Sequence, residues 1–130
     1  MDNKVKIFAI AVVILVLGII GLALVGPGEN PAEAGKYDVF AQCLKDQGAI
    51  FYGTFWCPYC KAQKEMFGSS AKLLPYFECS TPDGRNQVPA CTEKSIKSYP
   101  TWDFADGSRL TGKIPFQQLA EKTGCSLPAE

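Results

Sequence analysis

The sequence contains no histidine and no excess of charge of either sign. Its 130 residues include 13 basic and 13 acidic side chains, so the formal net charge at pH 7 is zero. Without histidine, a Ser-His-Asp or Cys-His triad, a histidine general base and a mixed Cys/His zinc site are excluded. Balanced charge gives no strongly basic surface, so no nucleic-acid partner is expected. The length is that of about one domain.

A long apolar run lies near the N-terminus. Residues 7–26 carry only apolar side chains and glycine. At about 1.5 Å rise per residue, a helix of this length crosses a hydrocarbon core of about 30 Å. A buried core helix is the alternative, but a run without a polar face has no place in so small a domain. We predict a transmembrane anchor over residues 1–26, a linker rich in proline and glycine over 27–36, and a folded domain over 37–130.

The charges that flank the apolar run predict its orientation. Lys4 and Lys6 precede the run, and Glu29 and Glu33 follow it. The positive-inside tendency places the N-terminus in the cytoplasm and the folded domain outside, in the periplasm or at the cell exterior. We therefore predict a single-pass protein of the cell membrane. A cleaved signal peptide is the alternative, because residues 32–34 have the small-x-small form of a processing site.

Periodicity and turn residues predict an α/β domain after the linker. Helices are expected at 38–48, 58–68, 70–74, 90–98 and 115–122, and strands at 49–56, 76–79, 101–105 and 108–111. The strand at 49–56 is a near-continuous apolar run, which is typical of a strand buried on both faces. Asp106-Gly107 is a strong hairpin signal between the last two strands.

The six cysteines are an even number in a domain that we place outside the cytoplasm, so disulfides are permitted. Cys57 and Cys60 differ from the rest, because they form a CxxC motif where a predicted strand meets a predicted helix. There, backbone N–H groups and the helix dipole stabilise a thiolate, which is the geometry of a redox pair. A zinc site that adds Cys79 and Cys91 is the alternative, but those two are farther apart than paired zinc ligands usually are. We expect no metal.

Three motifs resemble the thioredoxin superfamily. They are the segment 55–61, which contains the dithiol, the tripeptide 99–101, and the hairpin at 106–107. The resemblance implies a thioredoxin-like fold, in which a central mixed sheet is flanked by helices. It also implies that Pro100 is a cis proline that faces the dithiol and the substrate, with Tyr99 as its neighbour. An enzyme of this kind is a thiol-disulfide oxidoreductase, and we expect no cofactor.

A closer resemblance covers roughly residues 38–125. Segments 40–68, 74–80 and 98–104 are similar to the thioredoxin-like domain found fused to, or beside, bacterial and plant vitamin K epoxide reductase homologues. This implies a protein that exchanges disulfides between protein substrates and a quinone-linked membrane oxidoreductase. The chain has one membrane segment and no reductase domain, so the oxidoreductase is expected to be a separate chain.

The sequence departs from thioredoxins at two places near the dithiol. Phe51 stands where thioredoxins carry a buried acidic residue, six positions before the first active cysteine. The dipeptide between the cysteines is Pro58-Tyr59, whereas many strong oxidases have Pro-His. The direction of electron flow does not follow from the sequence.

The other four cysteines are expected to form structural disulfides. The resemblance supports a bridge between Cys79 and Cys91, which flank a local loop, and this leaves Cys43 and Cys125 to each other. Both pairs would stabilise the fold by restricting the unfolded chain. A relay of oxidation between Cys79/Cys91 and the active pair is the functional alternative.

At the expected active site, Cys57 is predicted to attack and Cys60 to resolve, because Cys57 is nearer the helix start and more exposed. We expect Trp56, Pro58 and Tyr59 to face the substrate, together with Tyr99 and Pro100. The predicted core aromatics are Phe40, Phe51, Phe55, Trp102 and Phe104, and the predicted solvated lysines are Lys61, Lys64 and Lys72. Two other functions stay open: a dedicated thiol reductant of the cytochrome c maturation type, and a disulfide-stapled binding module with an inert Cys57–Cys60 bond.

Overall fold

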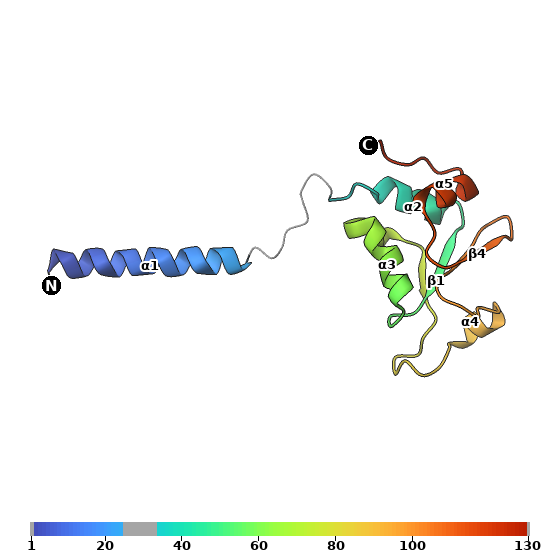
Figure 1. Cartoon of the computed structure of the whole chain (residues 1–130), viewed down its shortest axis with the longest axis horizontal. Helices are drawn as coiled ribbons and strands as arrows, with labels where there is room; N and C mark the ends of the chain where they lie inside the picture. The colour runs from blue at the N-terminus through green and yellow to red at the C-terminus, as the bar shows by residue number, and fades with distance from the viewer. Residues whose placement is uncertain (1, 25–33, 130) are drawn as a thin grey trace. The chain divides into compact units, whose positions relative to one another are not determined.

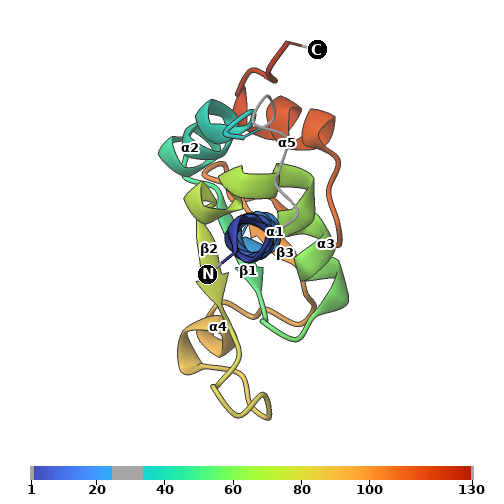
Figure 2. The ribbon, with the colours of Figure 1, turned by 90° about the vertical axis from the view of Figure 1, so that its left-hand side faces the viewer.

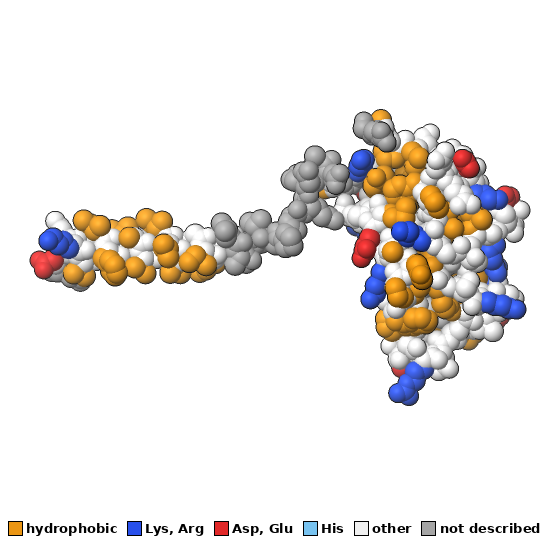
Figure 3. Space-filling view, in the orientation of Figure 1, with side chains coloured by type: hydrophobic (Ala, Val, Ile, Leu, Met, Phe, Trp, Pro, Cys, Tyr) orange, Lys and Arg blue, Asp and Glu red, His pale blue; other side chains and the backbone are white. Residues whose placement is uncertain are grey.

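The computed structural model describes residues 2–24 and 34–129, and the chain divides into two units, Met1–Pro31 and Ala32–Glu130. Helix α1 (Asn3–Leu24) belongs to the first unit (Figure 1). Its segment Asn3–Gly21 has a mean hydropathy of 2.5 and exposed side chains, and by length and composition it can cross a membrane. Figure 3 shows hydrophobic side chains along its visible surface, with charged side chains at its N-terminal end.

Some of the sequence predictions lie outside the described residues. The linker predicted over 27–36 is described only from Ala34 onward. Most of the possible processing site at 32–34 and both acidic residues that flank the apolar run, Glu29 and Glu33, also lie outside. Where the description resumes, a turn leads into helix α2 (Asp38–Asp46).

The second unit contains a four-stranded mixed sheet in the order β2-β1-β3-β4. Strand β1 (Ile50–Gly53) runs parallel to β2 (Tyr76–Glu78) and antiparallel to β3 (Thr101–Asp103). Strand β4 (Arg109–Thr111) pairs antiparallel with β3 through the predicted hairpin, where Gly107 has a φ of 82°. The predicted α/β class, with a mixed sheet flanked by helices, is confirmed. The arrangement is a thioredoxin-like fold.

Helices flank this sheet and cover its ends. Helix α3 (Pro58–Phe67) continues into the 3₁₀ helix η1 (Gly68–Leu73), and α5 (Phe116–Thr123) ends at Gly124, which adopts the left-handed conformation. Figures 1 and 2 place α2 and α5 together at one end of the domain and α4 (Pro89–Glu93) at the other. Helix α3 carries the CxxC motif at its start.

Helix α4 is shorter than the predicted helix over 90–98. Ser95 has a positive φ of 56°, which interrupts helical geometry. The carbonyl groups of Lys94 and Ser95 accept hydrogen bonds from the Arg109 guanidinium, which also pairs with Asp103. A contact with the distant strand β4 therefore satisfies the carbonyl groups just beyond the end of this helix.

Strand β1 is also shorter than predicted, because it ends at Gly53 and does not continue to Trp56. A Cβ atom at Gly53 would lie 3.0 Å from the Cys60 sulfur and 2.9 Å from a ring carbon of Tyr76. Beyond Gly53, the Phe55 N–H donates to the Glu78 carboxylate and the Phe55 ring is 49% exposed. The prediction that Phe55 lies in the core is wrong.

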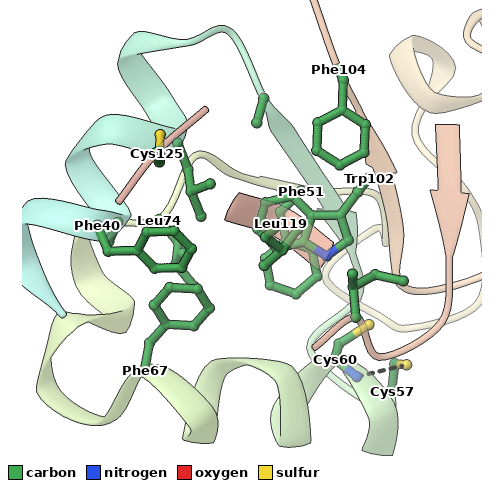
Figure 4. Packing of buried hydrophobic residues seen from close by; sticks show 14 residues of the cluster. Phe40, Phe51, Cys57, Cys60, Phe67, Leu74, Trp102, Phe104, Leu119 and Cys125 are labelled. Carbon is green, nitrogen blue, oxygen red and sulfur yellow. Dashed lines mark hydrogen bonds between the residues drawn. The ribbon is translucent and has the colours of Figure 1, made fainter. Parts of the chain in front are cut away.

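The core lies between the sheet and the helices (Figure 4). Phe40, Phe51, Trp102 and Phe104 are buried, as predicted, and Phe67 and Leu119 join them. Phe51 stacks on Trp102 with ring centroids 4.8 Å apart. Burial of each such side chain contributes roughly 1.5–3 kcal/mol, so the core supplies a rigid support for the CxxC motif at its edge.

Candidate active site

Cys57 and Cys60 lie at the N-terminus of α3, and both thiols are free. Cys57 is the N-cap residue, with extended backbone angles, and Pro58 is the first helical residue, where its missing N–H costs no hydrogen bond. The Cys60 N–H donates to the Cys57 sulfur at 3.3 Å (Figure 4). A negative charge on this sulfur meets an N–H group and the positive end of the helix dipole.

The two cysteine residues differ little in exposure, because Cys57 is 4% exposed and Cys60 is 1% exposed. The predicted difference in exposure is therefore small. Their surroundings differ more, since the Cys57 thiol lies 3.6 Å from the Tyr99 carbonyl oxygen, to which it donates. Cys57 thus lies between α3 and the residue that precedes strand β3.

Cys60 lies in a less polar environment. Burial is the main cause that raises the pKa of its thiol to about 12, and its hydrogen bond with Cys57 adds to the increase. The backbone of Thr54 and the charge of Lys64 act in the opposite direction. At neutral pH, Cys60 is therefore a protonated thiol, which suits the second, resolving step of an exchange reaction.

Exposed aromatic side chains surround the dithiol. Trp56 is 49% exposed and Tyr59 is 66% exposed, while Pro58 between the cysteines is also at the surface. The Trp56 indole donates to the Ser80 hydroxyl at 3.1 Å, and its ring packs edge-on against Tyr99. The indole is thus held at the surface beside the cysteines.

Beside Tyr59 is an open groove of about 500 Å³, lined by Tyr59, Ser98, Tyr99, Thr111, Gly112 and Lys113. It joins the start of α3 to the loop before β3 and to the end of β4. Tyr99 connects the groove to the dithiol, because its carbonyl contacts the Cys57 thiol.

Tyr99 and Pro100 lie opposite the CxxC motif, and the peptide bond between them is cis. The cis bond is as the resemblance implies, and the Pro100 ring is buried. That Pro100 faces the substrate stays a prediction. Tyr99 is half-buried, and its hydroxyl accepts a hydrogen bond from Gln87. The group that faces the dithiol here is the Tyr99 backbone carbonyl.

The remaining cysteines form two disulfides, Cys43–Cys125 and Cys79–Cys91. Cys43–Cys125 joins α2 to the segment after α5, and Cys79–Cys91 joins the end of β2 to α4. Cys79 and Cys91 are both completely buried. In this state their sulfurs are not thiolates, so they are not available as the zinc ligands considered from the sequence.

Three side chains near Cys60 are not recognisable as site residues in the sequence. They are Lys64, Tyr76 and Glu78. The Lys64 ammonium lies 3.4 Å from the ring centroid of Tyr76, and the Tyr76 hydroxyl donates to Glu78. Lys64 is therefore half-buried against an aromatic ring and only partly solvated, whereas Lys61 and Lys72 are exposed as predicted. Lys64 follows Cys60 by four residues, which places it one helical turn away on the same face of α3. This spacing is the feature of the sequence that indicates a lysine near the Cys60 thiol.

Comparison with known proteins agrees with this geometry. No family model matches the chain. The chain is 46% identical over 105 residues to the thiol-disulfide oxidoreductase LTO1 of Arabidopsis thaliana, a match that covers 76% of this chain and 27% of the relative. The chain therefore spans about a quarter of the relative's length. The fold and this similarity together support the assignment of the chain to the thioredoxin-like superfamily.

Proposed function

We propose that this protein is a thiol-disulfide oxidoreductase whose active pair is Cys57 and Cys60. The observation that carries the proposal is the pair of free thiols at the start of α3, with the Cys60 N–H directed at the Cys57 sulfur. The first sulfur therefore faces an N–H group at a helix start, while the second belongs to a buried, protonated thiol. The name of the similar plant protein, a thiol-disulfide oxidoreductase, supports the same activity.

The reaction proceeds through a mixed disulfide. The Cys57 thiolate attacks one sulfur of a partner disulfide, and the other partner sulfur leaves as a thiolate. Cys60 then loses its proton and attacks the Cys57 sulfur, which forms the Cys57–Cys60 disulfide and releases the second partner thiolate. Two electrons pass from the dithiol to the partner. The same steps in reverse oxidise a partner dithiol.

Substrates in this proposal are protein thiols and disulfides. Phe55, Trp56 and Tyr59 expose aromatic surface around the dithiol, and aromatic side chains are common anchors in protein interfaces. The groove beside Tyr59 offers space for an extended segment, and it is lined by Tyr99, whose carbonyl contacts the Cys57 thiol. In this docking, Tyr99 lines the groove and presents its carbonyl to Cys57. We also assign Pro100, the next residue, to the segment that faces the substrate.

The cellular setting is also part of the proposal. Helix α1 anchors the protein in the cell membrane as a single pass, with its N-terminus in the cytoplasm and the thioredoxin-like domain outside. The two disulfides suit an oxidising compartment. The redox partner is a separate, quinone-linked membrane oxidoreductase of the vitamin K epoxide reductase type, as the sequence resemblance implies.

The test is a trapping experiment with a Cys60→Ser variant of the full chain in membranes. This variant keeps the attacking thiol and lacks the resolving one, so it should accumulate mixed disulfides through Cys57 that a reductant releases. The matched control, Cys57→Ser, should trap nothing. If the Cys60→Ser variant is folded and captures no partner, the site is the inert bond of a binding module.

A further inference from the structure

The resolving step requires that the buried Cys60 thiol give up a proton. Cys60 is 1% exposed, and burial raises its pKa to about 12, so the thiolate is scarce at neutral pH. A proton that leaves a buried group needs a nearby acceptor to avoid a high barrier. The groups around Cys60 decide which acceptor is available.

Gly53 brings Cys60 close to Tyr76. A Cβ atom at Gly53 would lie 3.0 Å from the Cys60 sulfur and 2.9 Å from Cε2 of Tyr76. The sulfur and the phenol ring therefore flank the same point of strand β1, where glycine leaves space. On the far side, the Phe51 ring contacts Tyr76 edge-on and contributes only apolar surface.

Tyr76 connects this point to a carboxylate. The Tyr76 hydroxyl donates to one oxygen of Glu78, and the other oxygen accepts the Phe55 and Ser80 N–H groups, each at 3.1 Å. These three hydrogen bonds fix the orientation of a half-buried carboxylate. Burial and the contact with Glu78 raise the pKa of Tyr76, so its hydroxyl stays protonated and can relay a proton without accumulating as a phenolate.

The other charged or titratable groups that face this cluster come from α3. Lys64 places its ammonium 3.4 Å from the Tyr76 ring centroid, and its charge favours the thiolate of Cys60. Cys57 faces both Cys60 and Tyr76, and a negative charge on it disfavours a second one on Cys60. Glu78 is the carboxylate in this set.

We propose that Glu78, acting through Tyr76, accepts the proton that Cys60 loses when it resolves the mixed disulfide. The proposal rests on the proposed redox function of the Cys57/Cys60 pair. As the Cys60 sulfur attacks Cys57, its proton passes through one water molecule to the Tyr76 hydroxyl, and the hydroxyl proton passes to Glu78. The Cys60–Cys57 bond forms, the bond from Cys57 to the partner breaks, and the partner leaves as a thiolate. Glu78 later returns the proton to solvent. In the reverse direction, protonated Glu78 supplies the proton to the leaving Cys60 thiolate.

The experiment mixes the reduced full chain with a small aromatic disulfide whose released thiol absorbs light. Each turnover releases two aromatic thiolates in separate phases. The first phase is the attack by Cys57 and depends on reagent concentration, while the second is resolution by Cys60 and does not. Both phases are recorded from about pH 6 to about pH 9 for the wild type and each variant.

In the Glu78→Gln variant, the amide oxygen still accepts the Phe55 and Ser80 N–H groups, but the base is lost. We expect the second phase to slow roughly 10- to 100-fold at neutral pH and to rise in proportion to hydroxide, because solvent must then take the proton. The first phase should be unchanged. Glu65→Gln, on the exposed surface of the same helix as Cys60, is the matched control and should alter neither phase.

A second variant keeps the test decisive if Glu78→Gln fails to fold. Tyr76→Phe retains the ring that Lys64 contacts and removes the relay hydroxyl, so it should slow the second phase in the same way. An unchanged second phase in the folded variants, or equal slowing of both phases, would overturn the proposal while leaving the redox function intact. Absence of the first phase in the wild type would instead contradict the proposed function.

Discussion

The Cys57 thiol donates to the backbone carbonyl of Tyr99, 42 residues later, at a sulfur-to-oxygen distance of 3.6 Å. The contact joins the start of α3 to the segment that enters β3. It leaves the Cys60 sulfur on the inner side of Cys57, against Gly53 and Tyr76. We therefore expect an incoming disulfide to meet Cys57 before Cys60, although both residues are buried.

The first prediction concerns thiol reactivity. After mild reduction that leaves the other two disulfides intact, a small alkylating reagent at neutral pH should modify Cys57 and leave Cys60 unmodified. The reason is that burial raises the pKa of Cys60 to about 12 and keeps its sulfur inside. Peptide mapping by mass spectrometry over time gives the order, and modification of Cys60 first would contradict the arrangement.

The second prediction concerns the stability of the reduced protein at high pH. The pKa of Cys60 rises from an ordinary 9.0 to about 12 in the folded state. Below pH 9 the contribution of the Cys60 thiol to the free energy of unfolding is fully present. Between pH 9 and 12 the unfolded chain binds fewer protons than the folded one, so the free energy of unfolding falls as the pH rises. Denaturant titrations of the wild type and Cys60→Ser should diverge in this range, with the wild type losing more. Tyr52 and Tyr76 titrate in both proteins, so they do not cause a difference between the two. If stability falls equally with pH in both proteins, the raised pKa of Cys60 is contradicted.

The third prediction separates structural disulfides from a relay. Replacing both Cys79 and Cys91 by serine should lower the free energy of unfolding by about 3 kcal/mol and leave the alkylation rate of Cys57 unchanged. Their complete burial supports this, because no partner thiol reaches either sulfur in the folded state. Replacing Cys43 and Cys125, which close a longer loop, should cost about 4.5 kcal/mol on the same basis. A folded Cys79/Cys91 variant that reacts normally at Cys57 and fails to exchange with its membrane partner would instead identify a relay.

The fourth prediction concerns topology. In spheroplasts, an added protease should digest the thioredoxin-like domain and leave a tag placed before Lys4 protected, because basic residues at the start of α1 favour the cytoplasmic side. Lysed spheroplasts, in which both sides are digested, serve as the control. Protection of the folded domain in intact spheroplasts would reverse the orientation and remove the basis for an oxidising compartment.

The sequence predicted well those features that depend on local residues. Pro58 and Gly68 define the two ends of α3, so the CxxC motif is placed at a helix start without tertiary information. The turn at Asp106-Gly107 likewise defines the hairpin, because its glycine needs a positive φ. Both signals act over a few residues, and both are found in the structure.

Features that depend on distant contacts were not predictable in the same way. Strand β1 ends at Gly53, where Cys60 and Tyr76 approach its backbone. Just beyond it, Phe55 is exposed and its N–H binds the distant Glu78. Lys64 was assigned to solvent, since a lysine on a helix gives no sign that an aromatic ring from β2 lies beneath it. The groups that we propose to accept the Cys60 proton can therefore be identified only from the folded structure.

The most direct test of the account is the redox equilibrium of Cys57 and Cys60 against glutathione. The fraction of oxidised pair, measured by mass after acid quenching and alkylation, should follow a single two-electron transition between about −270 mV and about −120 mV. A value near the first limit favours a reductant, and one near the second favours an oxidant. The transition should vanish in Cys57→Ser. A pair that stays fully reduced or fully oxidised over the whole range would contradict a redox function for this site.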